Sequence, residues 1–287
     1  MFDMRYHIAS LVAVFLALTV GLLLGSVIVD KGMLAKQQEQ LVASIKSDVD
    51  RVTQENKNLQ AELAKIKGYQ EQIVTAAIKN RLSEQTVLVV TFTPEQQETY
   101  QQIAKAIIEA GGQVQQLKVD LAKLDFNNKE LTSRLWTSFN SSETATATVT
   151  APPDFENKFW TRFGEELTGN ATSTLLNALL KEGAVELDLT KVPYKNIVVV
   201  AAAKEQTSNR DLLLIEALKN KPQLSRLLGV ETAAQKPSRA AAYKLKEIST
   251  IDNIDESPGR ISLILLLQNP DLKGNFGIKA TAERLMP

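Results

Sequence analysis

Residues 8–29 read IASLVAVFLALTVGLLLGSVIV, an apolar run of twenty-two residues that contains no charged side chain. As an α-helix rising about 1.5 Å per residue, the run would be about 33 Å long, which matches the hydrocarbon core of a bilayer. A cleaved signal peptide has a shorter apolar region and ends in a small-residue cleavage site, and this sequence has neither feature. We therefore expect residues 1–30 to form a short tail and an uncleaved signal anchor in membrane lipid.

Small side chains recur at every fourth position of this anchor. On a helix they form one stripe, and the last two members make a GxxxG pair. Such a stripe lets two membrane helices approach closely, so it predicts that the anchor dimerises. The stripe consists of Ala9, Ala13, Ala17, Gly21 and Gly25.

The charges flanking the anchor do not fix its orientation. Arg5 precedes the apolar run, whereas Lys31 and Lys36 follow it, so the positive charges on the two sides nearly balance. Large domains that follow an anchor are translocated largely regardless of local charge, which leaves an extracytoplasmic domain open.

Residues 31–83 predict a coiled-coil stalk. Residues 35–82 contain no proline and a single glycine, Gly68. Apolar side chains recur there with the three-then-four spacing of heptads, which places them in one seam along a helix. The expected d positions are Ile45, Val52, Leu59, Ile66 and Ile73, and the apolar a positions are Val42, Val49, Leu63 and Ala77.

Polar residues in this pattern indicate how the helices pair. Asn56 falls at an a position, where two amides can bond across a parallel two-stranded seam, and Gln70 occupies another a position. Glu62 at g and Lys67 at e are complementary between parallel chains. The alternative is a long amphipathic helix packed on its own domain, but about four sustained heptads favour the coiled coil. We expect a parallel homodimer or a higher homo-oligomer.

Residues 84–287 predict an α/β domain with a mainly parallel sheet. Short apolar, β-branched runs that are typical of buried strands alternate with helical patterns, which is the order of a parallel sheet. The expected strands are residues 86–92, 113–119, 196–203, 226–231 and 246–251.

Helices are expected between these strands. One begins near Pro94 and runs to Gly111, and another covers residues 211–218. With Ser257 as N-cap and Pro258 in the first turn, residues 259–268 predict a third helix, although their apolar run could also be a strand.

Two other segments of the domain have distinctive compositions. Residues 137–153 are rich in serine and threonine and predict a loop or hinge. The aromatic residues gather on either side of that segment and are expected in the core. They are Trp136, Phe155, Phe159, Trp160 and Phe163.

The composition restricts the chemistry of the chain. Its 33 basic and 33 acidic residues cancel, so no net field attracts nucleic acid. There is no cysteine and a single histidine, His7, which excludes disulfides, thiolate metal sites and a Ser-His-Asp triad within one chain. The glycine-rich phosphate loops and the GxSxG motif are absent from the sequence. We expect no enzymatic activity, no catalytic residue, no cofactor and no resident metal.

Two small groups of side chains in the sequence could act as metal ligands. Asp252, Asp255 and Glu256 precede a predicted helix, and we interpret them as solvated capping carboxylates, since Ca²⁺ normally takes six or more oxygens. Met4 and His7 lie at the membrane edge, but two soft ligands per chain make a poor site by themselves.

Three stretches of the sequence resemble the MctB family of mycobacterial-type copper transporters. The first is RYHIASLVAVFLAL at residues 5–18, with Gly21 and LGS at residues 24–26. The second is STIDNID at residues 249–255, with Gly259 behind it, and the third is GNFGIKATA at residues 274–282, with Leu285 and Pro287.

The resemblance implies copper transport or copper homeostasis at the cell envelope, and a domain on the extracytoplasmic side of the cytoplasmic membrane. Some members are linked instead to cell separation, together with a membrane partner. The alternative function is therefore a non-catalytic dimeric scaffold or signalling stalk that joins membrane partners to the envelope. The residues add no separate support for copper, because Cu(I) prefers thiolate, thioether and imidazole ligands, and the chain offers none, four and one of these.

Overall fold

The computed structural model describes residues 4–140, 151–169, 171–188, 192–203 and 208–287, without the side chains of residues 29–35, 139 and 140. The chain forms two compact units, Met1–Gly68 and Tyr69–Pro287. Each unit is described by itself below.

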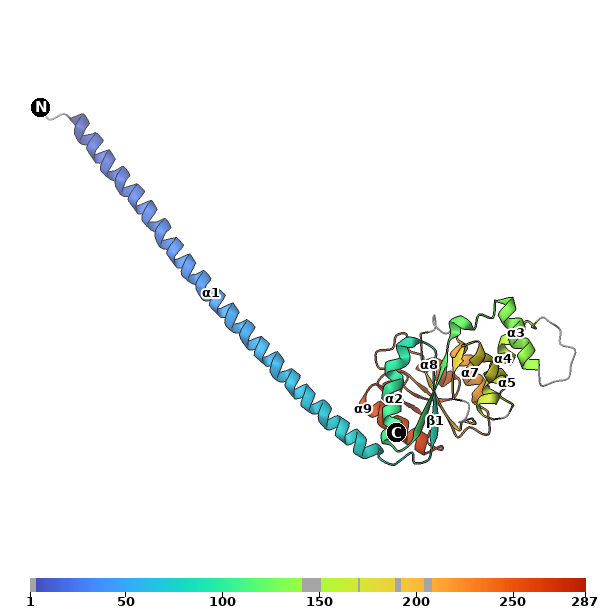
Figure 1. The fold of residues 1–287 in the computed structure, drawn as a ribbon. Helices are drawn as coiled ribbons and strands as arrows, with labels where there is room; N and C mark the ends of the chain where they lie inside the picture. Colours follow the sequence, from blue (N-terminus) through green and yellow to red (C-terminus); the bar gives the residue numbers. More distant parts are fainter. Residues whose placement is uncertain (1–3, 141–150, 170, 189–191, 204–207) are drawn as a thin grey trace. The chain divides into compact units, whose positions relative to one another are not determined.

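The first unit consists of most of helix α1, which runs without a break over Met4–Ile78 (Figure 1). Its part from Met4 to Ile28 is long and apolar enough to cross a membrane, by length and composition. The predicted anchor and the predicted stalk thus lie on one continuous helix.

The second unit is built on a seven-stranded sheet with the order β3-β2-β1-β4-β5-β6-β7. Among the strand pairs of the described residues, the β2–β3 pair is antiparallel and the other five are parallel, which confirms the predicted α/β class with a mainly parallel sheet. The strand order reverses between β1 and β4, because the chain winds outward from β1 in both directions. The strands are β1 (Thr86–Thr91), β2 (Gln113–Val119), β3 (Val185–Glu186), β4 (Asn196–Val200), β5 (Arg226–Val230), β6 (Ser249–Ile251) and β7 (Asn275–Phe276).

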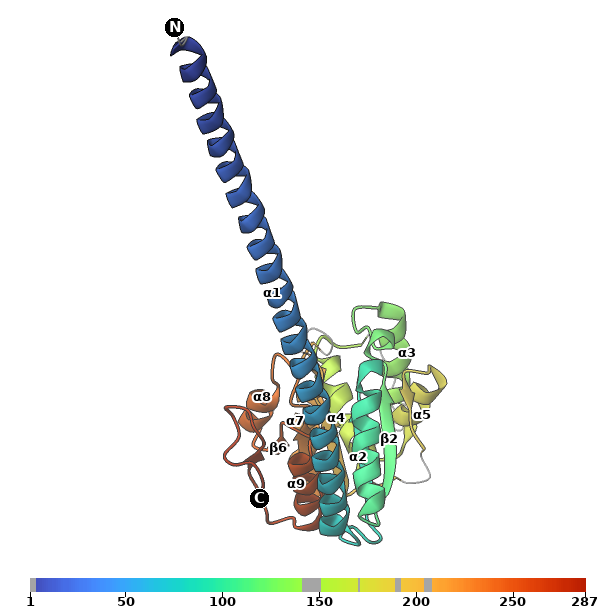
Figure 2. The same ribbon diagram turned by 90° about the vertical axis from the view of Figure 1, so that its left-hand side faces the viewer.

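One face of the sheet is covered by three helices that lie side by side in Figure 2: the end of α1, α2 (Gln97–Glu109) and α9 (Ser257–Gln268). Val74 and Ile78 of α1 are buried against apolar side chains of β1, α2 and α9. At the rim of this contact Arg260 of α9 donates two hydrogen bonds to Glu71, and this keeps the pKa of the Glu71 carboxyl below its ordinary value. The last turns of α1 therefore belong to the core of the domain.

Within the described part of the chain, five helices surround the core on the opposite face. The core on this face contains the predicted aromatic cluster. Phe159 and Trp160 meet edge to face with ring centroids 5.3 Å apart, and both side chains are fully buried. Buried Glu166 accepts hydrogen bonds from the first backbone amides of the next helix, Leu175 (3.0 Å) and Leu176 (2.8 Å). The helices are α3 (Lys129–Asn140), α4 (Phe155–Leu167), α5 (Thr174–Lys181), α7 (Arg210–Leu218) and α8 (Ala240–Leu245), and two short 3₁₀ turns are η1 (Pro94–Gln96) and η2 (Leu121–Lys123).

The prediction of a loop over residues 137–153 is wrong at its start, because α3 continues to Asn140. The Thr137 and Ser138 hydroxyls donate to the carbonyls of Ser133 (2.9 Å) and Arg134 (3.2 Å), so these polar residues are accommodated inside the helix. Residues 141–150 lie outside the described part of the chain, and residues 151–153 are not helical.

The choice between helix and strand at residues 259–268 is settled in favour of the helix. Helix α9 begins at Ser257, with Glu256 rather than Ser257 as its N-cap and Pro258 in its first turn. Gly259 lets this turn lie directly on the preceding loop, since a Cβ at that position would be 2.0 Å from the Asn253 carbonyl oxygen.

Replacing Gly259 should therefore destabilise the domain. We expect Gly259→Ala to lower the free energy of unfolding by about 2–3 kcal/mol, because the added methyl overlaps backbone that cannot move freely. The matched control is Gly68→Ala, where a Cβ meets nothing within 4 Å and the helix gains the propensity of alanine. Chemical unfolding of the full-length protein, followed by circular dichroism, measures both. Equal midpoints for Gly259→Ala and the unaltered protein would contradict the packing.

Candidate functional site

The predicted dimerisation residues all lie on α1. The seven apolar seam side chains remain between 44% and 63% exposed in the single chain, and Asn56 is exposed as well. In the membrane segment, a Cβ built on Gly21 or Gly25 meets nothing within 4 Å. The pairing of two chains stays a prediction. The seam side chains are Ile45, Val49, Val52, Leu59, Leu63, Ile66 and Ile73, and the other small residues of the anchor stripe, Ala9, Ala13 and Ala17, are also exposed.

In the last turns of α1, the side chains that enter the domain core and the last d-position side chain differ in burial. Val74 and Ile78 are 2% and 0% exposed in the domain core, whereas Ile73 is 63% exposed. In the heptad register Val74 and Ile78 occupy positions e and b, and Ile73 occupies d. In these last turns the domain therefore packs on the side of the helix that carries Val74 and Ile78 and leaves Ile73 exposed.

The crevice where open parallel sheets usually bind ligands is filled by a glutamine. Such crevices lie at the carboxyl ends of the strands, where the strand order reverses, which here is between β1 and β4. Buried Gln96 accepts from the Phe92 and Thr93 amides (2.6 and 3.1 Å), and its own amide donates to the Val200 carbonyl (2.8 Å). The backbone amides after β1 and the carbonyl at the end of β4 are thereby satisfied by the protein itself.

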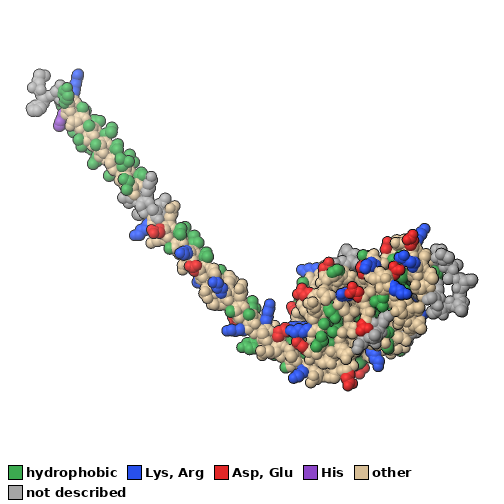
Figure 3. Space-filling model, in the orientation of Figure 1, with side chains coloured by type: hydrophobic (Ala, Val, Ile, Leu, Met, Phe, Trp, Pro, Cys, Tyr) green, Lys and Arg blue, Asp and Glu red, His purple; other side chains and the backbone are tan. Residues whose placement is uncertain are grey.

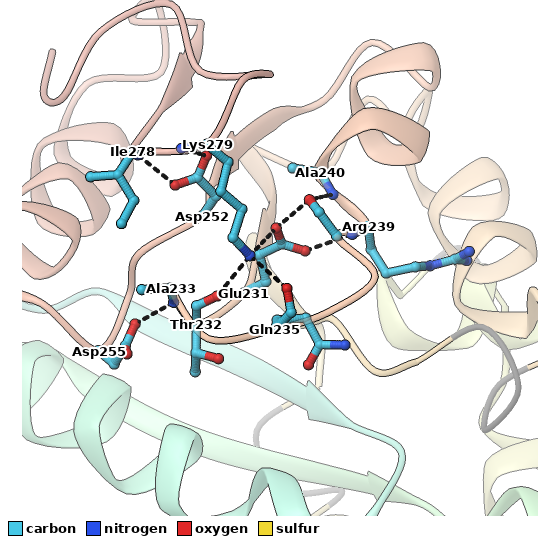
Figure 4. A network of polar contacts seen from close by, with 11 residues as sticks. Glu231, Thr232, Ala233, Gln235, Arg239, Ala240, Asp252, Asp255, Ile278 and Lys279 are labelled. Carbon is cyan, nitrogen blue, oxygen red and sulfur yellow. Dashed lines mark hydrogen bonds and ion pairs between the residues drawn. The ribbon is translucent and has the colours of Figure 1, made fainter.

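A charged network occupies the same edge of the sheet further along, at the ends of β5 and β6 (Figure 4). Glu231, 2% exposed, accepts from Lys279 Nζ (2.7 Å), from the Ser238 hydroxyl (2.5 Å) and from the Arg239 amide (2.7 Å). The Lys279 ammonium also donates to the carbonyls of Thr232 (2.9 Å) and Gln235 (3.1 Å). This lysine therefore fixes the C-terminal segment to the end of β5.

The interpretation of the acidic cluster as solvated is wrong for Asp252. This side chain is 1% exposed and accepts hydrogen bonds from the amides of Ile278 (2.7 Å) and Lys279 (3.1 Å). Asp255 accepts from the Ala233 amide (2.7 Å) and so holds the loop that follows β5. Among the described residues, no group of three histidine, cysteine, aspartate or glutamate side chains is arranged to hold a metal ion.

A buried ion pair extends this network towards α7. The Arg239 guanidinium contacts both carboxylate oxygens of Asp211 at 2.8 Å, and the Tyr243 hydroxyl donates to the same carboxylate at 2.8 Å. Burial, and then the neighbouring Asp211 charge, raise the pKa of Tyr243 well above its ordinary value, so the phenol stays protonated and remains a donor. These charges are paired with one another, so the network links α7 and α8 to the loop that follows β5 and stabilises this edge of the sheet.

The soft metal ligands of the chain lie outside this network. Met286 is the one thioether in the sequence of the second unit, which contains no histidine or cysteine, and its side chain is 38% exposed. Met4 and His7 are both exposed in the first turns of α1, three residues apart and so on one side of the helix. The domain therefore brings no set of soft ligands together.

Figure 3 shows charged side chains of both signs interspersed over the visible face of the domain, without one dominant sign. This distribution agrees with the balanced composition of the chain.

The sequence is similar to known proteins over the whole length of the chain. Residues 1–287 match a family described as "Copper transport outer membrane protein, MctB". Proteins named "Copper transporter MctB" from Mycobacterium bovis and from two strains of Mycobacterium tuberculosis are 25% identical over 311 aligned residues, which cover 100% of this chain and 98% of each relative.

The charged network predicts that replacing either of two lysines of the C-terminal segment changes the free energy of unfolding by very different amounts. Lys279→Met should lower the free energy of unfolding by about 3 kcal/mol, because it leaves the buried Glu231 carboxylate without its cation. Lys273→Met, at an exposed position of the same segment, should change it by less than about 0.5 kcal/mol. Urea unfolding curves of the two variants provide the comparison, and similar midpoints would mean that Lys279 does not secure the edge.

Proposed function

The chain belongs to the MctB family, and from this premise we propose that it takes part in copper transport or copper homeostasis at the cell envelope. The observation that carries the proposal is the extent of the match, which covers residues 1–287 here and nearly the whole length of the relatives named as copper transporters. The apolar helix, the rest of α1 and the α/β domain are therefore all inside the shared region.

We propose a bitopic arrangement, in which residues 1–30 form a signal anchor in the cytoplasmic membrane and the domain lies on the extracytoplasmic side. The length and apolar character of α1 between Met4 and Ile28 support the anchor. The side of the membrane is carried over from the family resemblance. A large domain behind an anchor can be translocated whatever the local charge, which agrees with this orientation.

We further propose that residues 31–83 pair with a second copy as a parallel coiled coil. The support is a stripe of large apolar side chains at the a and d positions of α1, from Ile45 to Ile73. Each of these side chains is about half exposed. Asn56 lies in the middle of that stripe and can bond to its counterpart in a parallel pair. Burying the stripe between two chains removes it from water, which favours association.

The domain is proposed to be non-catalytic and to leave the copper ion to other groups. Its carboxylates at the sheet edge are already paired, and its sequence offers Met286 as the single soft ligand. Copper as cargo would meet soft ligands at Met4 and His7 or on a membrane protein partner. One anchor per chain cannot line a pore by itself, so transport requires the oligomer or such a partner.

Copper content of cells tests the proposed function. Cells that lack the protein and grow under copper load should accumulate several times more copper than cells that express it, as measured by mass spectrometry of washed cells. A version with the membrane segment replaced by an unrelated apolar helix is the control for anchoring alone. Unchanged copper together with cells that fail to separate would contradict the transport role and favour the scaffold.

A disulfide test addresses the parallel pairing directly. Because the chain has no cysteine, Asn56→Cys introduces a single thiol at position a, which should form a disulfide with its counterpart under mild oxidation. Asn58→Cys, two residues away at position c, is the matched control and should crosslink poorly. Non-reducing electrophoresis of membranes measures both variants. Efficient crosslinking only between distant, non-equivalent cysteines would indicate antiparallel chains instead.

A further inference from the structure

A hollow of about 540 Å³ lies at the carboxyl ends of β1 and β2, and we propose that it binds an uncharged polyhydroxylated ligand, a sugar unit. The inference goes beyond copper handling and does not depend on it. It rests on where the hollow lies, which side chains line it and which charges surround it.

The hollow lies on the edge of the sheet that parallel sheets use for ligands, next to the crevice that Gln96 fills. The carboxyl ends of β1 and β2 adjoin the point where the strand order reverses, and ligands of open α/β sheets bind on this edge. Gln96 fills the space between β1 and β4, so the room that remains open lies on the β2 side. Its volume falls within the range of about 300–1,000 Å³ that small-molecule sites have.

Neutral polar groups converge in the lining. Gln116 of β2 donates from its amide to the Thr91 hydroxyl (3.1 Å) and to the Gln97 side-chain carbonyl (3.2 Å). These contacts hold both glutamines in place and leave the Gln116 carbonyl and the Gln97 amide able to bond a ligand. Asp120, directly after β2, accepts from the Ala122 amide (3.1 Å) and adds further acceptor capacity at the rim.

Apolar side chains complete the lining. Phe92 and Pro94 follow β1, and Val119 ends β2. A sugar ring has hydroxyl groups at its edge and C–H groups on its faces, so it needs amides and carboxylates around it and an apolar surface beneath it. The combination of side chains in this hollow supplies both.

The charges around the hollow disfavour an anionic ligand. Lys118 is the single cation of the lining and already pairs with Glu186 at 2.8 Å, and the second lining carboxylate, Asp120, pairs with the neighbouring Lys123 at 3.7 Å, so both of these lysines are already engaged by carboxylates. The helical turn after β1 begins with Pro94 and Glu95, and this acidic residue repels phosphate from the amides there. A neutral sugar is therefore a better fit than a nucleotide.

Saturation-transfer NMR on the full-length protein in lipid nanodiscs tests the proposal, since nanodiscs avoid sugar-based detergents. The probes are glucose, arabinose and N-acetylglucosamine, with adenosine monophosphate as the anionic comparison. We expect transfer to at least one sugar and none to the nucleotide. Gln97→Leu and Asp120→Asn should each weaken sugar binding about ten-fold, because the first removes an amide and the second replaces a carboxylate acceptor by an amide donor.

Two features keep the result interpretable. Gln101→Leu makes the same exchange on an exposed position of α2 outside the hollow, so it should bind as the unaltered protein does. Asparagine can replace Asp120 as the cap of η2, so this variant should fold even if Gln97→Leu does not. No transfer to any of the sugars, stronger binding of the nucleotide, or equal affinities for Asp120→Asn and Gln101→Leu would overturn the proposal.

Discussion

The burial of Val74 and Ile78 in the domain core is the contact on which the remainder of this structure depends. It makes the last turns of α1 a third helix on one face of the sheet, beside α2 and α9. Because these residues lie at positions e and b of the heptads, Ile73 at the neighbouring d position remains exposed. One helix can therefore be part of the domain and still offer an apolar stripe to a second copy.

From the boundary between β1 and β4 to the C-terminal segment, the carboxyl edge of the sheet is closed by the chain's own polar groups. Gln96 bridges β1 and β4, and Lys279 bridges the end of β5 and the C-terminal segment. Buried charges are costly unless they are paired, so these contacts account for side chains such as Glu231 and Asp252 at a place where other α/β proteins hold substrates. The copper role proposed from the family is thus consistent with a domain that has a structural part in the protein and does not itself coordinate the copper ion.

Sequence patterns anticipated the elements that are long or strongly apolar. The five predicted strands, the helix from Pro94 and the aromatic core were found, and β1 and β4 gave the clearest signal because burial on both faces leaves continuous apolar runs. The two-residue strands β3 and β7 have no such signal, since they form only by pairing with β2 and β6. The burial of Asp252 was also hidden, because its partners Ile278 and Lys279 lie more than twenty residues away in the sequence. Gln96 was missed for the same reason, since its amide bonds to Val200.

The distance between two copies of one position tests the account most directly. A spin label at Gln72, which is exposed and outside both the seam and the domain contact, reports whether the last turns of α1 pair while they remain in the domain core. Pulsed electron paramagnetic resonance on the full-length protein in nanodiscs should give one short, narrow distance between equivalent labels. The absence of dipolar coupling, or a broad distribution of long distances, would contradict a helix that serves the domain and the dimer at the same time.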